Sequence, residues 1–362
     1  MRAEPLRSYG PDTIRAFAVG NPSEAFGEPY RVFDRDRVIA RLPGPPYQFL
    51  DRVVSVVGEP FVLKDGAACV AEYDVPAGEW YFAANRCPRM PFSILLEVAL
   101  QPCGWLAAYC GSALTSESDL SFRNLGGQGT QLAEVGPGIG TLATAVTMTK
   151  VAKSAGMIIQ HYDMKVTARD GRPVYEGTTY FGFFAKEALR NQLGIAGAKV
   201  PYLDADQRAF AESGMLPADA PFPTPMLRMV DGIDGYLRRG GKAGLGLIQG
   251  RIAVDPGFWF FSAHFHQDPV WPGSLGLESF LQLLKYVAWK KWRTVPEGGW
   301  QVVAVNHPHQ WTYRGQVLPT DREVVVVLEV TAVDEAARKL TAGGFLTVDG
   351  RVIYQMTNFV LQ

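Results

Sequence analysis

Two long and mostly apolar stretches, residues 92–109 and 274–289, stand out along the chain. Pro91 and Pro272 come just before them, where proline suits the first turn of a helix because its missing N–H would have no partner there. Each stretch therefore predicts a helix that is apolar on most of its faces. Such a helix must be wrapped by other elements rather than laid on a surface.

The segments that follow each predicted helix alternate between apolar and polar residues. Their period of two and their β-branched residues predict antiparallel strands. We therefore expect an α+β fold in which a curved antiparallel sheet wraps a central helix. Pro102 lies inside the first helix and removes one backbone donor, which predicts a kink near Gln101. The clearest strand patterns are TLATAVTMTKV, GMIIQHYDMKV, EVVVVLEVTAV and KLTAGGFLTVDG.

An internal repeat organises the chain. WYFAAN at 80–85 matches WFFSAH at 259–264, and MPFSILLEVALQ at 90–101 matches WPGSLGLESFLQ at 271–282. Further matches, DGRPVYEGTTYF with DGRVIYQMTNF and PPYQFLDRV with PMLRMVDGI, follow the same order at nearly the same offset. The sequence therefore predicts two copies of one fold in tandem.

The limits of the repeat predict four segments. We expect a leader over residues 1–40, a first domain over 41–185, a linker over 186–220 and a second domain over 221–362. A chain of 362 residues has the length for two such domains.

Composition narrows the kinds of partner. The chain is 47% hydrophobic and carries 35 Lys and Arg against 36 Asp and Glu, which argues against a nucleic-acid or membrane-surface binder. The N-terminus lacks the apolar run of a signal peptide, so the simplest compartment is cytoplasmic. No CxxC pair occurs, and we interpret all four cysteines as reduced packing residues: Cys69, Cys87, Cys103 and Cys110.

The best candidate for chemistry is His264, in the segment FWFFSAHFHQDPVWPGSLGLESFLQ. We expect it at the end of an aromatic strand, just before the second helix. The N–H groups at that helix start, near Gly273, would stabilise a negative oxygen developing on a thioester carbonyl. His264 would then be a base for the carbon beside the carbonyl. Glu278 and Gln282 follow on one face of the helix.

These residues carry a resemblance to a known family. HFHQDPVWPGSLGLESFLQL, with TYRGQVLPT at 312–320, resembles the bacterial 3-hydroxyacyl-carrier-protein dehydratases, and most of all 3-hydroxydecanoyl dehydratase/isomerase. WYFAANRCPRMPFSILLEVALQPCGWLAAY resembles the dehydratase regions of polyunsaturated fatty acid synthases and iterative polyketide synthases. The resemblance covers roughly residues 40–362.

The resemblance implies a tandem hot-dog fold and a (3R)-hydroxyacyl substrate on the phosphopantetheine arm of an acyl carrier protein. It further implies that water is eliminated without a metal or organic cofactor, that other synthase domains are partners, and that a homodimer is possible. The family's dehydratase/isomerase has aspartate where this chain has glutamate, so isomerisation is a separate question.

The resemblance also implies a composite site, because in this family the histidine of one hot-dog works with the carboxylate of the other. His264 would then face Glu97, which is followed one helical turn later by Gln101. Glu278 would face Asn85, which cannot act as a base at neutral pH. We therefore expect one working site, in which Glu278 is the lesser candidate.

Other interpretations of the same residues remain open. His264 could be a hydrogen-bonded core histidine, and Glu97 and Glu278 could be buried carboxylates without a catalytic role. His264 with His266, and His307 with His309, form two HxH pairs that could bind a metal, although no metal site is expected.

Three other functions compete with dehydration. A thioesterase of the same fold would release free acid, a non-catalytic module would only bind acyl groups, and a metal hydrolase would use the HxH pairs. The basic residues near the end of the second helix are either a solvated end or a docking patch for an acidic carrier protein: Lys285, Lys290, Lys291 and Arg293.

Overall fold

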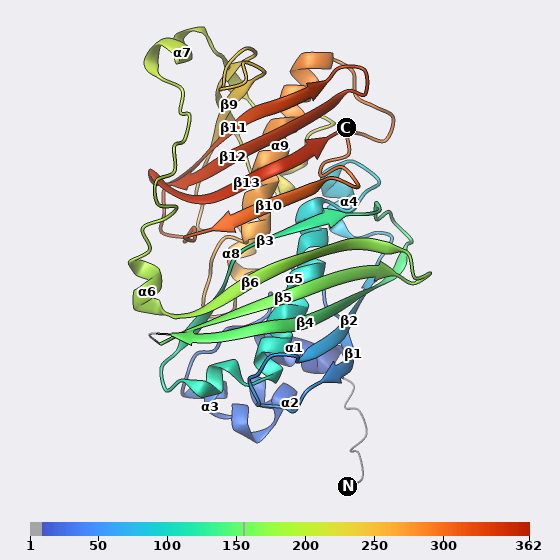
Figure 1. Cartoon of the computed structure of the whole chain (residues 1–362), viewed down its shortest axis with the longest axis vertical. Coiled ribbons are helices and arrows are strands. Elements are labelled where there is room, and N and C mark those ends of the chain that lie inside the picture. Colours follow the sequence, from blue (N-terminus) through green and yellow to red (C-terminus); the bar gives the residue numbers. More distant parts are fainter. Residues whose placement is uncertain (1–8, 155) are drawn as a thin grey trace.

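A computed structural model describes residues 9–154 and 156–362, so residues 1–8 of the expected leader lie outside the described part. Within these residues one 13-stranded sheet runs through the molecule in the order β1-β2-β4-β5-β6-β3-β10-β13-β12-β11-β9-β8-β7 (Figure 1). All strand pairings in it are antiparallel. Each half of the sheet curves around one long helix, which confirms the α+β double hot-dog fold.

The first half holds six of these strands. Their long apolar and polar alternation leaves every second side chain buried against the helix, as in β5. The strands are β1 (Arg52–Val57), β2 (Ala68–Val75), β3 (Leu120–Gln131), β4 (Gly140–Ser154), β5 (Met157–Ala168) and β6 (Pro173–Ala185).

The second half repeats the arrangement with an additional edge strand, β7, that comes from the expected linker and pairs with β8. The strands are β7 (Glu212–Met215), β8 (Gly232–Leu237), β9 (Leu247–Ala253), β10 (Pro308–Tyr313), β11 (Glu323–Asp334), β12 (Lys339–Val348) and β13 (Arg351–Leu361).

The halves join along β3 and β10, which pair antiparallel from Thr130↔Pro308 to Gly126↔Thr312. A side chain at Gly127 would lie 2.5 Å from the Trp311 ring, so this glycine lets the indole pack across the junction. The junction therefore makes one continuous sheet from two repeats.

The two central helices are α5 (Phe92–Tyr109) and α9 (Gly273–Trp292), and they lie side by side. Helix α5 is long and apolar enough to cross a membrane, but 94% of it is buried inside the protein, as a core helix is. It continues as a helix through Pro102. Every residue of α5 is buried except Gly104.

The structure corrects one sequence prediction. The aromatic segment before His264, expected to be a strand, is a short helix, α8 (Trp259–Ala263), and the matching segment of the first half is also a helix, α4 (Trp80–Asn85). Phe260, Phe261 and Ala263 are buried, which is a helical spacing and not the alternation of a strand. His264 therefore caps a helix instead of ending a strand.

The leader and the linker also contain ordered elements. Leader residues pack on α5, where the hydroxyl of Tyr30 donates to the carbonyl of Ala108 and Phe26 lies against Trp105. These segments supply α1 (Pro11–Val19), α2 (Pro22–Phe26), η1 (Glu28–Tyr30), α3 (Val32–Arg35), α6 (Lys186–Arg190) and α7 (Ala205–Phe210), while η2 (Ser112–Thr115) and η3 (Pro225–Leu227) lie within the repeats.

Candidate active site

His264 is held by a tight loop that closes on itself. The amide of Val270 donates to the carbonyl of His264 at 2.8 Å, and Nδ1 of His264 lies 3.0 Å from the carbonyl of Val270. A carbonyl oxygen only accepts, so Nδ1 carries the proton and Nε2 keeps a free lone pair. Asp268 in the same loop accepts a hydrogen bond of 2.9 Å from Nη2 of Arg123 and forms an ion pair with its Nη1 at 2.9 Å, and these contacts anchor the loop to β3.

Burial is the main cause that lowers the pKa of His264 from 6.5 to about 3. The nearby Arg123 lowers it further, whereas the bond to Val270 and the charge of Asp268 raise it. The imidazole is therefore neutral near pH 7 and can accept a proton at Nε2.

Glu97 lies on α5 of the first half and is buried. Ser274, at the start of α9 in the second half, donates to its Oε1 at 2.6 Å, and Gln101 donates to its Oε2 at 3.1 Å. Burial raises the pKa of this carboxyl above its usual value, while the two donors lower it. The carboxyl is thus placed to hold a proton at a higher pH than a solvated glutamate would.

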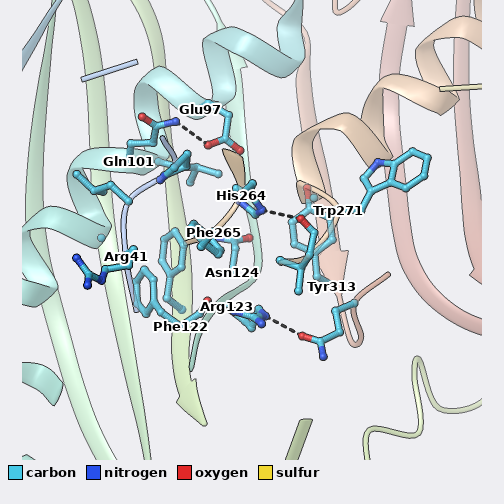
Figure 2. Close-up of a pocket in the computed structure, with 18 of the residues that line it drawn as sticks. Arg41, Glu97, Gln101, Phe122, Arg123, Asn124, His264, Phe265, Trp271 and Tyr313 are labelled. Atoms are coloured by element: carbon cyan, nitrogen blue, oxygen red, sulfur yellow. Dashed lines mark hydrogen bonds between the residues drawn. The ribbon is translucent and has the colours of Figure 1, made fainter. Parts of the chain in front are cut away.

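One cavity of about 90 Å³ brings the two groups together. Glu97 and His264 both line it, one from each half, and Figure 2 shows them around a shared space. The cavity is also lined by Leu42, Leu100, Gly104, Phe122, Arg123, Asn124, Phe181, Phe265, Trp271, Gly273, Tyr313 and Gln316.

Gly273 is the first residue of α9 and lies at the cavity wall. Its N–H belongs to the first turn, where helix amides lack a partner within the helix. A Cβ at this position would lie 2.9 Å from the ring of Tyr313, so glycine is required for Tyr313 to pack against the helix start. The helix N-terminus can therefore approach a carbonyl in the cavity.

Gln101 holds Glu97 in place. Its side-chain amide donates to Glu97 and to the carbonyl of Tyr47, and its Oε1 accepts from the amide of Phe49 at 2.8 Å. Both of its N–H groups are therefore used, and these contacts support a positioning role rather than contact with an oxyanion.

The second half contains the corresponding residues without an open site. Glu278 accepts from Ser93 at 3.1 Å and from Gln282 at 3.2 Å, as Glu97 does from Ser274 and Gln101. Here, however, Nζ of Lys285 donates to Oδ1 of Asn85 at 3.3 Å, and the cavity is only about 20 Å³. Glu278 therefore faces Asn85 and a lysine, while Glu97 shares a cavity with His264.

Both sequence interpretations of Lys285 are wrong. This lysine is buried, so it belongs neither to a solvated helix end nor to a docking patch. Lys290 and Lys291 pair with Glu212 at 2.9 Å and Glu335 at 2.5 Å. Arg293 lies over the ring of Trp289. These cations already have partners within the chain.

The sequence did not identify two residues of the site, Tyr47 and Ser274. Tyr47 lies 2.8 Å from Ser274, and since Ser274 gives its proton to Glu97, Tyr47 donates to Ser274. The match of Ser93 with Ser274 in the repeat was an available signal for the serine. Tyr47 corresponds to Leu227 in the second half, so no pattern pointed to it.

The HxH pairs do not assemble a metal centre. Across residues 9–154 and 156–362, no three His, Cys, Asp or Glu side chains gather where they could hold a metal ion. His309 is buried against Tyr175, with 3.1 Å between Nε2 and the phenol oxygen, whereas His307 contacts Lys339. The two histidines of this pair therefore have different partners.

The fold and this site define a double hot-dog protein with one histidine–glutamate cavity shared between its halves. The chain belongs to the FabA-like domain family, which matches residues 42–178 and 222–357. It is 30% identical over 379 aligned positions to one subunit of the polyunsaturated fatty acid synthase of Thraustochytrium sp. (strain ATCC 26185 / S-3), and 94% of this chain is covered. The match spans 25% of that protein's length.

Solved structures resemble this chain at low identity. A protein described as an oleoyl thioesterase, from Lactobacillus plantarum, superposes with a TM-score of 0.50 at 10% identity, over 82% of this chain and 96% of its own. The dehydratase domain of RzxB from Pseudomonas fluorescens superposes with a TM-score of 0.49 at 11% identity, over 88% and 98%. Likeness at this level concerns the fold alone.

Proposed function

We propose that this chain dehydrates (3R)-hydroxyacyl thioesters, carried on the phosphopantetheine arm of an acyl carrier protein, to trans-2-enoyl thioesters. The observation that carries the proposal is the shared cavity. It holds a neutral imidazole with a free lone pair and a carboxyl whose burial favours protonation, supplied by opposite halves. A base and an acid at two sides of one small space suit an elimination.

In the proposed reaction, Nε2 of His264 takes the proton from C2 while Glu97 gives its proton to the hydroxyl leaving C3. The C2–H and C3–O bonds break, a C2–C3 double bond forms, and water departs. The N–H of Gly273 binds the thioester oxygen as negative charge develops on it. Passage of the proton from the imidazolium back to the carboxylate restores the starting state.

These proton transfers need no redox or metal chemistry, so we expect no cofactor beyond the carrier's phosphopantetheine. The relative is named as a subunit of a polyunsaturated fatty acid synthase, which supports a carrier protein and other synthase domains as partners. The cytoplasm is kept as the proposed compartment. A double-bond shift after dehydration is a further possibility of the same base.

Incubation with a 3-hydroxyacyl carrier protein, followed by mass spectrometry of the carrier, tests the function. We expect loss of one water with the acyl group still attached. Release of free acid would instead indicate a thioesterase, and an unchanged carrier would indicate a binding module.

His264→Ala should abolish this dehydration in a folded protein because it removes the base, a loss of at least ~100-fold. Asn85→Ala, the matched change in the other half, should leave turnover nearly unchanged because an amide there is not a base. Substantial turnover by folded His264→Ala would contradict the assignment.

A further inference from the structure

Gly104 is the one residue of α5 that is not buried, and it lies at the wall of the cavity that holds Glu97 and His264. It comes seven residues after Glu97, about two helical turns, so both lie on one face of the helix. A position without a side chain on an otherwise fully packed helix leaves space beside the site.

The other half shows what a side chain does at this position. The helix repeat that pairs Glu97 with Glu278 and Gln101 with Gln282 also pairs Gly104 with Lys285. Lys285 lies in its own cavity with Asn85 and Glu278, and that cavity is about 20 Å³ against about 90 Å³ beside Gly104. The glycine therefore leaves open the space that the lysine fills.

The lining of this open space includes both apolar and polar residues. Its apolar part includes Leu42, Leu100 and Phe122. Figure 2 shows Phe122 on the opposite side of His264 from Tyr313. The polar part of the lining includes Arg123 and Gln316, which are hydrogen-bonded to each other at 2.8 Å. An acyl tail suits the apolar part, and the amides of a pantetheine arm suit the polar part.

A second recess, of about 10 Å³, lies beside Gly104. It shares Arg41, Gly104 and Phe122 with the main cavity. Phe122 lies between the two spaces and stacks on Phe181, with ring centroids 4.5 Å apart. The Arg41 guanidinium donates to the carbonyls of Phe17 and Gly20, so it is bound to the leader. The remaining lining is apolar: Ile39, Ala40, Ala108, Ala113 and Phe183.

We infer that the acyl tail lies over Gly104 and extends toward the recess behind Phe122, so that these two residues set the accepted chain length and favour medium and long chains over short ones. This inference rests on the proposed function. The helix advances roughly 16 Å from Glu97 to Ala108. A C–C bond of about 1.5 Å advances an extended zigzag chain by roughly 1.3 Å, so a chain of roughly 13 carbons covers that distance.

Binding of saturated thioesters tests the inference without requiring turnover. Butanoyl-pantetheine and dodecanoyl-pantetheine would be titrated calorimetrically into the full chain and its variants. We expect the dodecanoyl thioester to bind at least ~10-fold more tightly to the unmodified protein, because its additional methylenes are buried. Equal binding of both, or binding of neither, would overturn the inference.

Gly104→Val should weaken dodecanoyl binding at least ~10-fold and leave butanoyl binding unchanged, because its methyl groups narrow the passage. Gly104→Ala is the milder variant. Its Cβ would meet Leu42 and Phe122 at 3.5 Å, an ordinary contact, and alanine favours a helix over glycine, so thermal stability should not fall. A smaller loss of the same selectivity is expected. Equal weakening of both ligands by folded Gly104→Ala would contradict a role in chain length.

Lys285→Met is the matched control in the other half and should change neither affinity. An effect of this variant on dodecanoyl selectivity would show that the Gly104 effects are not local. Dehydration would be measured separately on 3-hydroxybutanoyl and 3-hydroxydodecanoyl carrier protein. A protein that keeps the chain-length preference in binding but forms no enoyl product would refute the proposed reaction and leave this inference standing.

Discussion

Glu97 and Glu278 have nearly the same surroundings, each held by a serine of the opposite helix and by a glutamine four residues later. What separates them is the group across the cavity, His264 for Glu97 and Asn85 with Lys285 for Glu278. The pair therefore offers a comparison in which the local contacts are matched and the proposed chemistry is not.

Glu97→Gln should lower dehydration at least ~100-fold, because it removes the proton donor and keeps the shape. Glu278→Gln, the matched control, should cost less than ~5-fold. Steady-state kinetics of both variants on one carrier-bound substrate decides the matter. If Glu278→Gln is inactive and Glu97→Gln is active, the pairing of His264 with Glu97 is wrong and His264 works with Glu278 of its own half.

Among the secondary-structure elements, the start of α9 both packs against aromatic rings and provides the proposed N–H donor for the thioester oxygen. Gly273 allows Tyr313 to approach, and Tyr313 in turn lies against Tyr354 with ring centroids 4.5 Å apart. The helix start is therefore fixed from the side by two packed rings.

Gly273→Ala should displace either Tyr313 or the first turn of α9, because the added methyl would lie 2.9 Å from the ring. A small misplacement of the N–H donor should lower turnover roughly 100-fold while the protein still folds. Thermal unfolding and turnover would be measured together. Full activity in this variant would show that the helix start does not bind the thioester oxygen.

The elements also show how far the sequence alone could lead. Both central helices and the tandem repeat were predictable, because long apolar stretches and a constant offset need no spatial information. The short helix α8 was mistaken for a strand, since five aromatic-rich residues are too few to reveal a period.

Some residues of the candidate site were also predictable from the sequence, and others were not. His264 and Glu97 could be named from the repeat and the family resemblance, and their catalytic roles stay predictions. Tyr47 was not found, and Lys285 was assigned to a helix end or docking patch. The contacts of both depend on partners about 200 residues away, Ser274 and Asn85. Such contacts exist only once the two halves are packed together.

In the molecule as a whole, the protonation of His309 links the stability of the junction between the halves to pH. It lies on β10 at the junction, packed against Phe92 of α5 and hydrogen-bonded to Tyr175 of β6. Burial lowers its pKa from 6.5 to about 4. The folded protein therefore keeps it neutral under mildly acidic conditions in which the unfolded chain would bind a proton.

This difference gives His309 a stability contribution that is present above pH 6.5 and is lost as pH falls toward 4, by roughly 3 kcal/mol in total. Glu97 and Glu278 act with the opposite sign, since burial raises their pKa. Urea unfolding of the native chain and of His309→Gln across this pH range isolates the histidine. We expect the stability gap between them to narrow on acidification, and a constant gap would contradict the assignment.

The difference in lining residues between the two cavities means that each half depends on the other. Two copies of the first half would give open cavities and no base, because each would contain Gly104 and Asn85. Two copies of the second half would give His264 and Glu278 in both cavities, each filled by Lys285. Neither half, paired with a copy of itself, would combine the histidine with an open cavity. On the proposed mechanism, the base, the acid and the open cavity therefore occur together only where both halves are present in one protein.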